Sequence, residues 1–237
     1  MSAMQAGIQL SSFKPLMIDS QGLDTVLSSM QGFGCCITQL QWIAPEISAD
    51  TIARLLKQYG IYSVGIQDKS PDIFACTDYY RSLAAICDIK EICVSGISED
   101  ITQFERKLNE LAESGYRLSY HPTRRDFDND AYLCEKLLAE VPDLRLCADV
   151  CQLNDAGLSP TRFIAAHSGR IDIVHFKDRN ADGKLCIVGE GKTDFAPIAR
   201  VCADSGAKYL LAEQETHEGN PIECLKRGFE YVSGLLC

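Results

Sequence analysis

Short apolar segments alternate with longer amphipathic segments along the whole chain, and this alternation is the feature that most constrains the fold. Strands are expected at residues 7–10, 35–41, 62–66, 91–95, 117–121, 144–150, 171–177 and 209–213. Helical patterns follow them at residues 22–30, 49–59, 78–88, 100–113, 131–139, 160–166, 195–204 and 221–235. Strands that alternate with helices in this way favour a parallel sheet covered by helices.

These eight β-α units occupy the chain without a linker or a low-complexity segment. Eight units in roughly 250 residues are typical of a (β/α)8 TIM barrel, an α/β fold. The alternative is an open doubly wound sheet, which often carries a glycine-rich first turn. Here the first expected strand is followed by Ser11-Ser-Phe-Lys-Pro15, which contains no glycine. The sequence therefore predicts a single (β/α)8 barrel domain over residues 1–237.

The composition argues against several classes of protein. The formal net charge is −10 and only 23 residues are Lys or Arg, whereas a surface that binds duplex nucleic acid needs clustered cations. No apolar run approaches the roughly 20 residues that span a bilayer, and the N-terminus lacks the regions of a signal peptide. The 12 cysteines include no Cys-x-x-Cys pair and predict reduced, structural thiols. We expect a cytoplasmic protein that binds neither nucleic acid nor membrane.

Four expected strands end in residues that can bind a metal ion or transfer a proton. These residues are His121, Asp149, His175 and Glu213, and the carboxyl ends of strands in a TIM barrel converge on one mouth. Asp149, His175 and Glu213 offer the mixed nitrogen and oxygen ligands that suit Mn²⁺, Mg²⁺, Co²⁺ or Zn²⁺. Each also has a structural interpretation: Asp149 as the cap of a turn, His175 as a core histidine, and Glu213 as the start of a polar loop.

Further polar side chains at the strand ends are candidates for substrate binding. Gln39 and Gln41 close the second expected strand and Gln67 closes the third, where their amides would bind the hydroxyls of a small-molecule sugar or cyclitol. Arg124 follows the fifth strand; it either contacts an anionic group of the substrate or is a solvated surface residue.

A glycine-containing segment after the seventh expected strand resembles the end of a phosphate-binding loop. This segment is Gly189-Glu-Gly-Lys-Thr193, but the full motif requires glycine at the position of Cys186. The segment is therefore interpreted as a turn, with Glu190 near the mouth as a further candidate for substrate binding.

Several motifs together resemble the sugar phosphate isomerase/epimerase family of xylose isomerase-like barrels. They are Gly7-Ile-Gln-Leu-Ser-Ser-Phe13, Tyr120-His121, Asp149, His175-Phe-Lys-Asp178, Val188-Gly-Glu-Gly191 and Ala212-Glu-Gln-Glu215. The resemblance covers essentially the whole chain and implies a TIM barrel with one divalent metal ion at its mouth. It also implies that Asp149, His175 and Glu213 are the metal ligands. Typical members isomerise or epimerise sugars, and relatives dehydrate inososes or act on keto-sugars.

The chain departs from the family pattern at two strands. Many members place a metal-binding Glu on the fifth strand, where this chain has Ser119 and His121 on one face. Others read Tyr-His-Asn-His there, whereas this chain reads Tyr120-His-Pro-Thr-Arg-Arg-Asp-Phe127. The second strand commonly ends in Glu, and here Gln39 and Gln41 are the available residues. The missing carboxylate weakens a symmetrical two-glutamate epimerase mechanism.

The expected activity is isomerisation or epimerisation of a ketose, keto-sugar or related polyol through an enediolate. The metal ion would polarise the carbonyl, Glu213 or His121 would act as the general base, and Lys177 would stabilise the enediolate oxygen. The same residues permit dehydration, so a keto-sugar or inosose dehydratase or lyase stays open, as does a non-catalytic sugar-binding protein. A DNA-repair nuclease on this barrel is disfavoured by the four histidines and the charge of −10. Homo-oligomerisation stays open.

Overall fold

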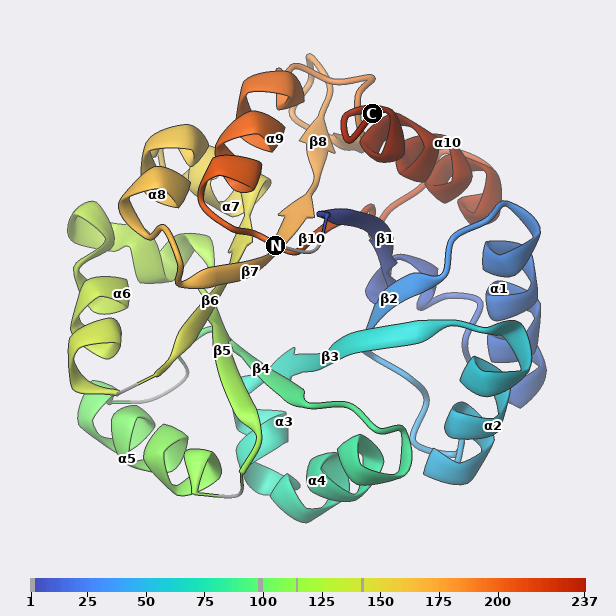
Figure 1. Cartoon of the computed structure of the whole chain (residues 1–237), viewed down its shortest axis with the longest axis horizontal. Coiled ribbons are helices and arrows are strands. Elements are labelled where there is room, and N and C mark those ends of the chain that lie inside the picture. Colours follow the sequence, from blue (N-terminus) through green and yellow to red (C-terminus); the bar gives the residue numbers. More distant parts are fainter. Residues whose placement is uncertain (1–2, 98–99, 114, 142) are drawn as a thin grey trace.

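Eight parallel strands close into a barrel, in the order β1-β10-β7-β6-β5-β4-β3-β2 (Figure 1). The computed structural model describes residues 3–97, 100–113, 115–141 and 143–237, with the backbone alone at residues 128–132. The barrel strands are β1 (Gln5–Gln9), β2 (Ile37–Leu40), β3 (Tyr62–Lys69), β4 (Glu91–Ser95), β5 (Arg117–His121), β6 (Arg145–Asp149), β7 (Ile171–Phe176) and β10 (Tyr209–Ala212). The predicted (β/α)8 barrel is confirmed.

Helices surround the barrel on all sides (Figure 1). They are α1 (Ser20–Gly32), α2 (Ala49–Tyr59), α3 (Ser70–Ala75), α4 (Thr77–Ile86), α5 (Ile101–Ala112), α6 (Asp128–Glu140), α7 (Val150–Asp155), α8 (Pro160–Ala166), α9 (Phe195–Asp204) and α10 (Pro221–Gly234). Local signals set their ends: the Ser48 side chain caps α2, and Gly60 ends it in the left-handed region with φ 62°. None of the helices in the described ranges is long and apolar enough to cross a membrane.

The structure contains short elements that the sequence patterns did not predict. Helices α3 and α7 each have six residues, too few to display a helical period in the sequence. Two 3-10 turns, η1 (Leu10–Phe13) and η2 (Arg124–Phe127), and a hairpin of β8 (Asp178–Arg179) and β9 (Leu185–Cys186) complete the set. Most of these elements follow a barrel strand directly, so they shape the rim of the mouth.

The barrel interior is filled by a small apolar layer that is separate from the larger core between strands and helices. Its buried members are Ile37, Val64, Cys93, Cys147, Ile173 and Leu211. Because side chains alternate along a strand, the residue two positions later on each strand points to the same side, one level nearer the carboxyl end. Those positions include Asp149, His175 and Glu213. The apolar layer is therefore the floor on which the polar strand ends stand.

Candidate functional site

Three neighbouring strand ends and the residues that follow them place a buried cluster of charge at the mouth. Asp149 pairs with His175 across β6 and β7, and Glu213 follows the last residue of β10. The exposed fractions are 0% for Asp149 and His175, 2% for Glu213 and 5% for Lys177. Buried charges need partners, so the contacts among these side chains define what the site can do.

Lys177 is surrounded by carboxylates. Its Nζ lies 3.2 Å from Asp149 Oδ2, 3.1 Å from Glu213 Oε1 and 3.4 Å from Glu215 Oε2. Burial lowers the pKa of Lys177, but the three carboxylates raise it further, so the pKa lies well above its usual value. The mouth therefore holds a permanently charged ammonium group.

Asp149 and Glu213 are anionic for the complementary reason. Burial raises the pKa of Asp149, but Lys177 and His121 lower it more, and the pKa lies far below the usual range. Burial likewise raises the pKa of Glu213, and Lys177 and His175 lower it to about 2. Both carboxylates keep their charge at neutral pH, as metal ligands must.

A hydrogen bond between His175 and Gln39 determines which ring nitrogen of His175 is free. Gln39 Oε1 accepts a hydrogen bond from Gln9 Nε2 at 2.7 Å and lies 2.8 Å from His175 Nε2. An amide oxygen bonds only to a donor, so His175 carries its proton on Nε2. The lone pair of His175 Nδ1 then faces Glu213 Oε2 at 3.0 Å. Two electron-pair donors at this distance repel each other unless a cation or a proton lies with them.

Several buried side-chain atoms at the mouth have no hydrogen-bond partner among the described residues, and four of them belong to histidines or carboxylates. They are His121 Nε2, Asp149 Oδ2, His175 Nδ1 and Glu213 Oε2, of which Asp149 Oδ2 also has the ion pair with Lys177. His121 Nε2 lies 3.7 Å from Asp149 Oδ2, and ligand atoms of His121, Asp149 and His175 all lie within 4.8 Å of one another. Two imidazoles and a carboxylate are compatible with a divalent metal ion.

The structure thus places His121 among the candidate ligands as well as at the cavity wall. Its Nδ1 lies 3.1 Å from Ser95 Oγ, which leaves Nε2 for the site. Burial lowers the pKa of His121, but Asp149 raises it more, so the pKa lies above its usual value. This group of candidate ligands contains Asp149 and His175 of the expected set and adds His121 from β5, whereas Glu213 is not part of it and contacts His175 instead.

A cavity of about 690 Å³ opens above this cluster. His121, Lys177 and Glu213 line it together with Gln41, Gln67 and Arg124, which are three of the residues expected to bind substrate. Arg124 is held at the rim because its Nε donates to Asp155 O at 3.1 Å. The volume is in the range of about 300–1,000 Å³ that is typical of small-molecule sites.

Two residues expected to bind substrate lie elsewhere. Gln39 is fully buried beneath His175, so it supports the histidine instead of facing the cavity. Glu190 forms an exposed ion pair with Arg227 on α10 and is not among the residues that line the cavity. Neither position could be read from the sequence, because strand-end proximity does not say which way a side chain turns.

The segment from Gly189 to Thr193 forms the expected turn, and its amides already hold an anion. The Asp178 carboxylate accepts hydrogen bonds from the backbone N–H of Gly189 at 3.1 Å, of Gly191 at 2.9 Å and of Thr193 at 3.2 Å. A Cβ on Gly191 would lie 2.3 Å from Asp178 Oδ1, so only glycine fits. The likeness to a phosphate-binding loop has a physical basis, but the anion is the chain's own side chain.

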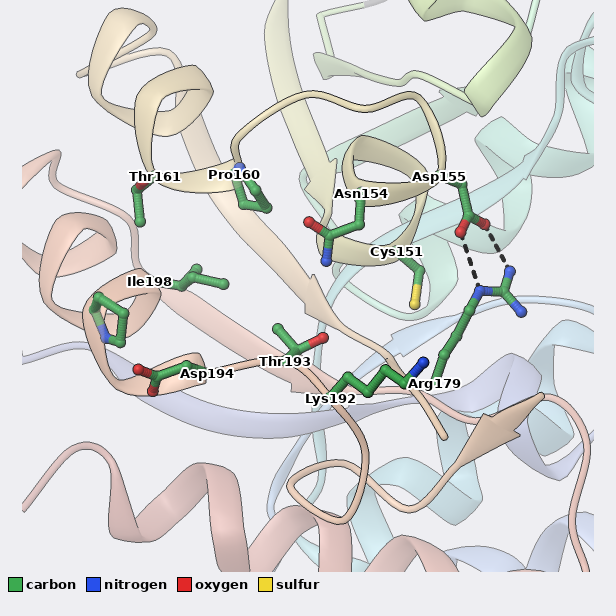
Figure 2. Close-up of a pocket in the computed structure, with 11 residues that line it drawn as sticks. Cys151, Asn154, Asp155, Pro160, Thr161, Arg179, Lys192, Thr193, Asp194 and Ile198 are labelled. Atoms are coloured by element: carbon green, nitrogen blue, oxygen red, sulfur yellow. Dashed lines mark hydrogen bonds and ion pairs between the residues drawn. The ribbon is translucent and has the colours of Figure 1, made fainter. Parts of the chain in front are cut away.

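Beside this turn lies a hollow of about 500 Å³, and both cations among the described residues that line it, Arg179 and Lys192, have partners within the chain. Figure 2 shows the contact of Arg179 with Asp155. Arg179 binds Asp155 with two nitrogens, Nε to Oδ1 at 3.1 Å and Nη2 to Oδ2 at 2.7 Å. Lys192 Nζ donates to Ala181 O at 3.0 Å. These contacts fasten the β8–β9 hairpin to α7 and make the hollow a structural feature.

Several residues of the mouth were missed by the sequence analysis. Gln9 and Ser95 end β1 and β4, and Glu215 lies two positions after Glu213 and lines the cavity. The strand-end rule would have found Gln9 and Ser95 if it had been applied to every polar residue type, whereas Glu215 lies beyond the end of β10. Burial and the neighbouring Glu213 raise the pKa of Glu215, and Lys177 opposes them, so the pKa lies above its usual value. Trp42, which lines the same cavity, had no signal in the strand pattern.

The fold and the site together define a class: a (β/α)8 barrel with a metal-competent mouth. Residues 41–234 match the family described as the xylose isomerase-like TIM barrel. The chain belongs to this family, as the motifs of the sequence indicated. No curated protein matches the chain in sequence.

Solved structures share the fold at low sequence identity. A sugar phosphate isomerase/epimerase from Parabacteroides distasonis superposes with a TM-score of 0.81 at 13% identity, over 98% of this chain and 94% of that one. D-allulose 3-epimerase from Methylomonas sp., in complex with D-allulose, gives 0.74 at 13%, over 99% and 98%. The probable 3-DHS dehydratase AsbF from Bacillus anthracis gives 0.74 at 15%, over 97% and 98%. The similar structures thus include isomerases, epimerases and a dehydratase.

Proposed function

We propose that this protein is a metal-dependent isomerase or epimerase of a ketose, keto-sugar or related polyol. The observation that carries the proposal is the group of buried histidine and carboxylate atoms without a hydrogen-bond partner beneath a sugar-sized cavity. Two of these atoms, His175 Nδ1 and Glu213 Oε2, lie 3.0 Å apart. Asp149, His175 and Glu213, with His121, would hold a divalent ion such as Mn²⁺, Mg²⁺, Co²⁺ or Zn²⁺. When bound, the ion acts as a Lewis acid that polarises the substrate carbonyl.

The chain's own groups account for the proton transfer. The carboxylate of Glu213 accepts the proton from the carbon next to the carbonyl, or the imidazole of His121 does so if its Nε2 is not a metal ligand. The electron pair of that C–H bond forms the enediolate. The ammonium of Lys177 stabilises the enediolate oxygen. Because its pKa is about 2, Glu213 is unprotonated at neutral pH but a weak base, so this mechanism depends strongly on stabilisation of the enediolate.

The fate of the proton distinguishes the possible reactions. Return of the proton to the neighbouring carbon gives an isomer, and return to the opposite face of the same carbon gives an epimer. Loss of hydroxide from the next carbon gives a dehydrated product, the outcome that the fold-level likeness to a dehydratase keeps in view. Gln41 and Gln67 on the cavity wall would bind the hydroxyls that set the substrate orientation, and Arg124 would contact an anionic substituent.

Proton exchange in D₂O tests the proposal directly. The protein with added Mn²⁺ is incubated with a panel of ketoses, keto-glycosides and inososes, and deuterium uptake is followed by NMR. We expect deuterium at the carbon next to the carbonyl of at least one substrate, and Glu213→Gln should lower the rate by about 10²–10⁴-fold. Glu190→Gln makes the same chemical change away from the cavity and should leave the rate unchanged.

Four outcomes would change or contradict parts of this proposal. Full exchange in Glu213→Gln would remove Glu213 as the base, and loss of exchange in His121→Gln with metal content retained would assign that role to His121. No exchange with any substrate, together with sugar binding, would identify a non-catalytic sugar-binding protein. A purified protein that retains none of the four metals would contradict metal dependence.

A further inference from the structure

A second cavity, of about 840 Å³, lies beside the mouth between the ends of β2 and β3 and helices α3 and α4. We call it the side cavity. It shares Gln41, Trp42, Gln67 and Lys69 with the cavity above the charge cluster. The two cavities therefore adjoin, and a ligand that occupies the mouth can extend directly into the side cavity. A single hexose would not fill both spaces, since each alone has the size of a complete small-molecule site.

The walls of the side cavity are apolar and aromatic. Met17, Leu40, Ile66 and Leu83 form buried parts of its lining, and the rings of Trp42, Tyr79 and Tyr80 add to it. Two of the largest exposed apolar side chains of the described residues, Ile18 at 71% and Tyr79 at 40%, also belong to it. Such concentrations of exposed apolar surface mark binding sites in soluble proteins.

The charged groups that line the side cavity balance each other, and Lys14 and Asp68 already have partners. Its lining contains two cations and two carboxylates, so the formal charges cancel; they are Lys14, Lys69, Asp68 and Asp72. Lys14 Nζ lies 4.5 Å from the centre of the Trp42 ring. Asp68 accepts hydrogen bonds from Tyr80 Oη at 2.8 Å and from Lys69 N at 2.9 Å. With no net charge to satisfy, the cavity favours a neutral apolar ring over an anion or a cation.

The backbone of Trp42 is held in an unfavourable conformation, which fixes the position of its ring. Trp42 has φ 54°, a left-handed conformation that is unfavourable for a bulky side chain. Such residues persist only where the surrounding structure determines their conformation. The strain sets the indole at the boundary between the two cavities, where it can contact a ligand in both.

We propose that the side cavity binds a second, neutral ring of the ligand, the aromatic or alicyclic aglycone of a glycoside whose sugar lies in the mouth. The inference rests on the proposed function for the identity of the sugar site, but it concerns binding and not the reaction. It assigns the specificity of the protein to glycosides instead of free monosaccharides.

The single tryptophan of the chain makes the test direct. The intrinsic fluorescence of Trp42 is titrated with phenyl β-D-glucopyranoside and, separately, with methyl β-D-glucopyranoside. We expect the phenyl compound to shift the emission and to bind roughly ten-fold more tightly or better, because it buries an apolar ring. Equal affinities, or no response to the phenyl compound, would overturn the proposal.

Two matched variants locate the effect. Ala75 is an exposed residue of α3 that lines the side cavity, so Ala75→Phe should fill the space and reduce the affinity for the phenyl compound to that for the methyl compound. Ala85 is an exposed residue of α4 that does not line it, and Ala85→Phe should leave both affinities unchanged. Identical behaviour of the two variants would overturn the assignment.

The two proposals fail in different ways. A phenyl preference without proton exchange on any keto-substrate would contradict the proposed enzyme activity and leave the side cavity as a binding site. Proton exchange on a free ketose without any phenyl preference would support the enzyme activity and exclude the aglycone role.

Discussion

The two ends of the barrel hold buried charge in opposite ways. At the carboxyl end of the strands, one ammonium group, Lys177, faces the carboxylates of Asp149, Glu213 and Glu215. At the amino end, the buried carboxylate of Asp172 is contacted by Arg117 at 3.1 Å, by Lys208 at 3.1 Å and by Arg145. The buried Glu91 shares Arg117 at 3.2 Å.

The two ends of the barrel differ in how completely their buried carboxylates are paired. Among the described residues, no carboxylate oxygen of Asp172 or Glu91 lacks a hydrogen-bond partner. At the carboxyl end Asp149 Oδ2 has only its ion pair with Lys177, and Glu213 Oε2 lies against the His175 Nδ1 lone pair. The amino end has more cations than carboxylates in contact, and the carboxyl end has fewer. A fully paired end contributes to stability, and an end with unsatisfied anions is prepared for a ligand, in agreement with the division of labour in TIM barrels.

The largest effect is expected from Asp149→Asn. The change removes one ligand charge and the anion between Lys177 and His121, so we expect deuterium exchange to fall by about 10³-fold or more and bound metal, measured by elemental analysis, to be lost. Asp182→Asn, at an exposed turn, is the control and should change neither. Retained metal with retained exchange would contradict the assignment of the carboxyl end to function.

The next effect is expected from Asp172→Asn at the other end. Removing a buried anion leaves cations without their partner, which costs about 3–5 kcal/mol for fully buried pairs. Because the Arg117 and Lys208 side chains are each 44% exposed, water compensates in part, and we expect a loss of about 2–3 kcal/mol in urea unfolding. The exchange rate per folded molecule should stay unchanged; a variant that lost activity but not stability would reverse the comparison.

A smaller effect is expected from Gln39→Leu beneath the site. Without the amide oxygen, His175 loses the hydrogen bond that keeps its proton on Nε2, and support of this kind is worth about 10–100-fold in metal affinity. Metal titration should show weaker binding. Gln41→Leu, at the cavity wall, should instead raise KM and leave metal affinity unchanged, so equal effects in the two variants would contradict the placement of Gln39 below the ligands.

The smallest effect is a pH dependence at the amino end. Burial raises the pKa of Glu91, while Ser119 and Arg117 oppose it, and the pKa lies above its usual value. The folded state thus binds this proton more tightly than the unfolded state, so the contribution of Glu91 to stability is greatest below the unfolded pKa and is lost as pH rises through the folded pKa.

Glu91→Gln mimics the protonated form and removes this dependence. In urea unfolding, the variant should match the parent near pH 4 and become relatively more stable toward neutral pH. If the variant instead loses stability relative to the parent as pH rises, the ion pair with Arg117 outweighs burial at this position.

The sequence was sufficient for much of the architecture because its signals are local. Strand-length apolar runs with helical segments between them correctly predicted all eight barrel strands, and their ends pointed to Asp149, His175, Lys177 and Glu213 at one mouth. A strand's two-residue period is readable without a partner. The six-residue helices α3 and α7 were missed because an element shorter than two turns has no period to read.

Register and side-chain direction required the closed barrel. Between Leu146 and Cys147 the pairing of β6 with β7 shifts by one residue, which makes Asp172 the extra residue of β7; such a bulge re-aims a side chain. The Gln39 side chain contacts His175, and the Glu190 side chain pairs with Arg227. Both partners lie far away in the sequence, so neither direction could be read from the local segment.

The sequence by itself therefore determined the repeating β-α units, the closed barrel they imply, and the chemical groups available at the strand ends. Only the tertiary structure decided which atoms are left unpartnered, how the two ends divide the charges, and where Trp42 separates the mouth from the side cavity. The physical reason is the range of the forces that act. Propensity and periodicity depend on near neighbours in the chain, whereas pairing, burial and electrostatic balance depend on residues that only barrel closure brings together.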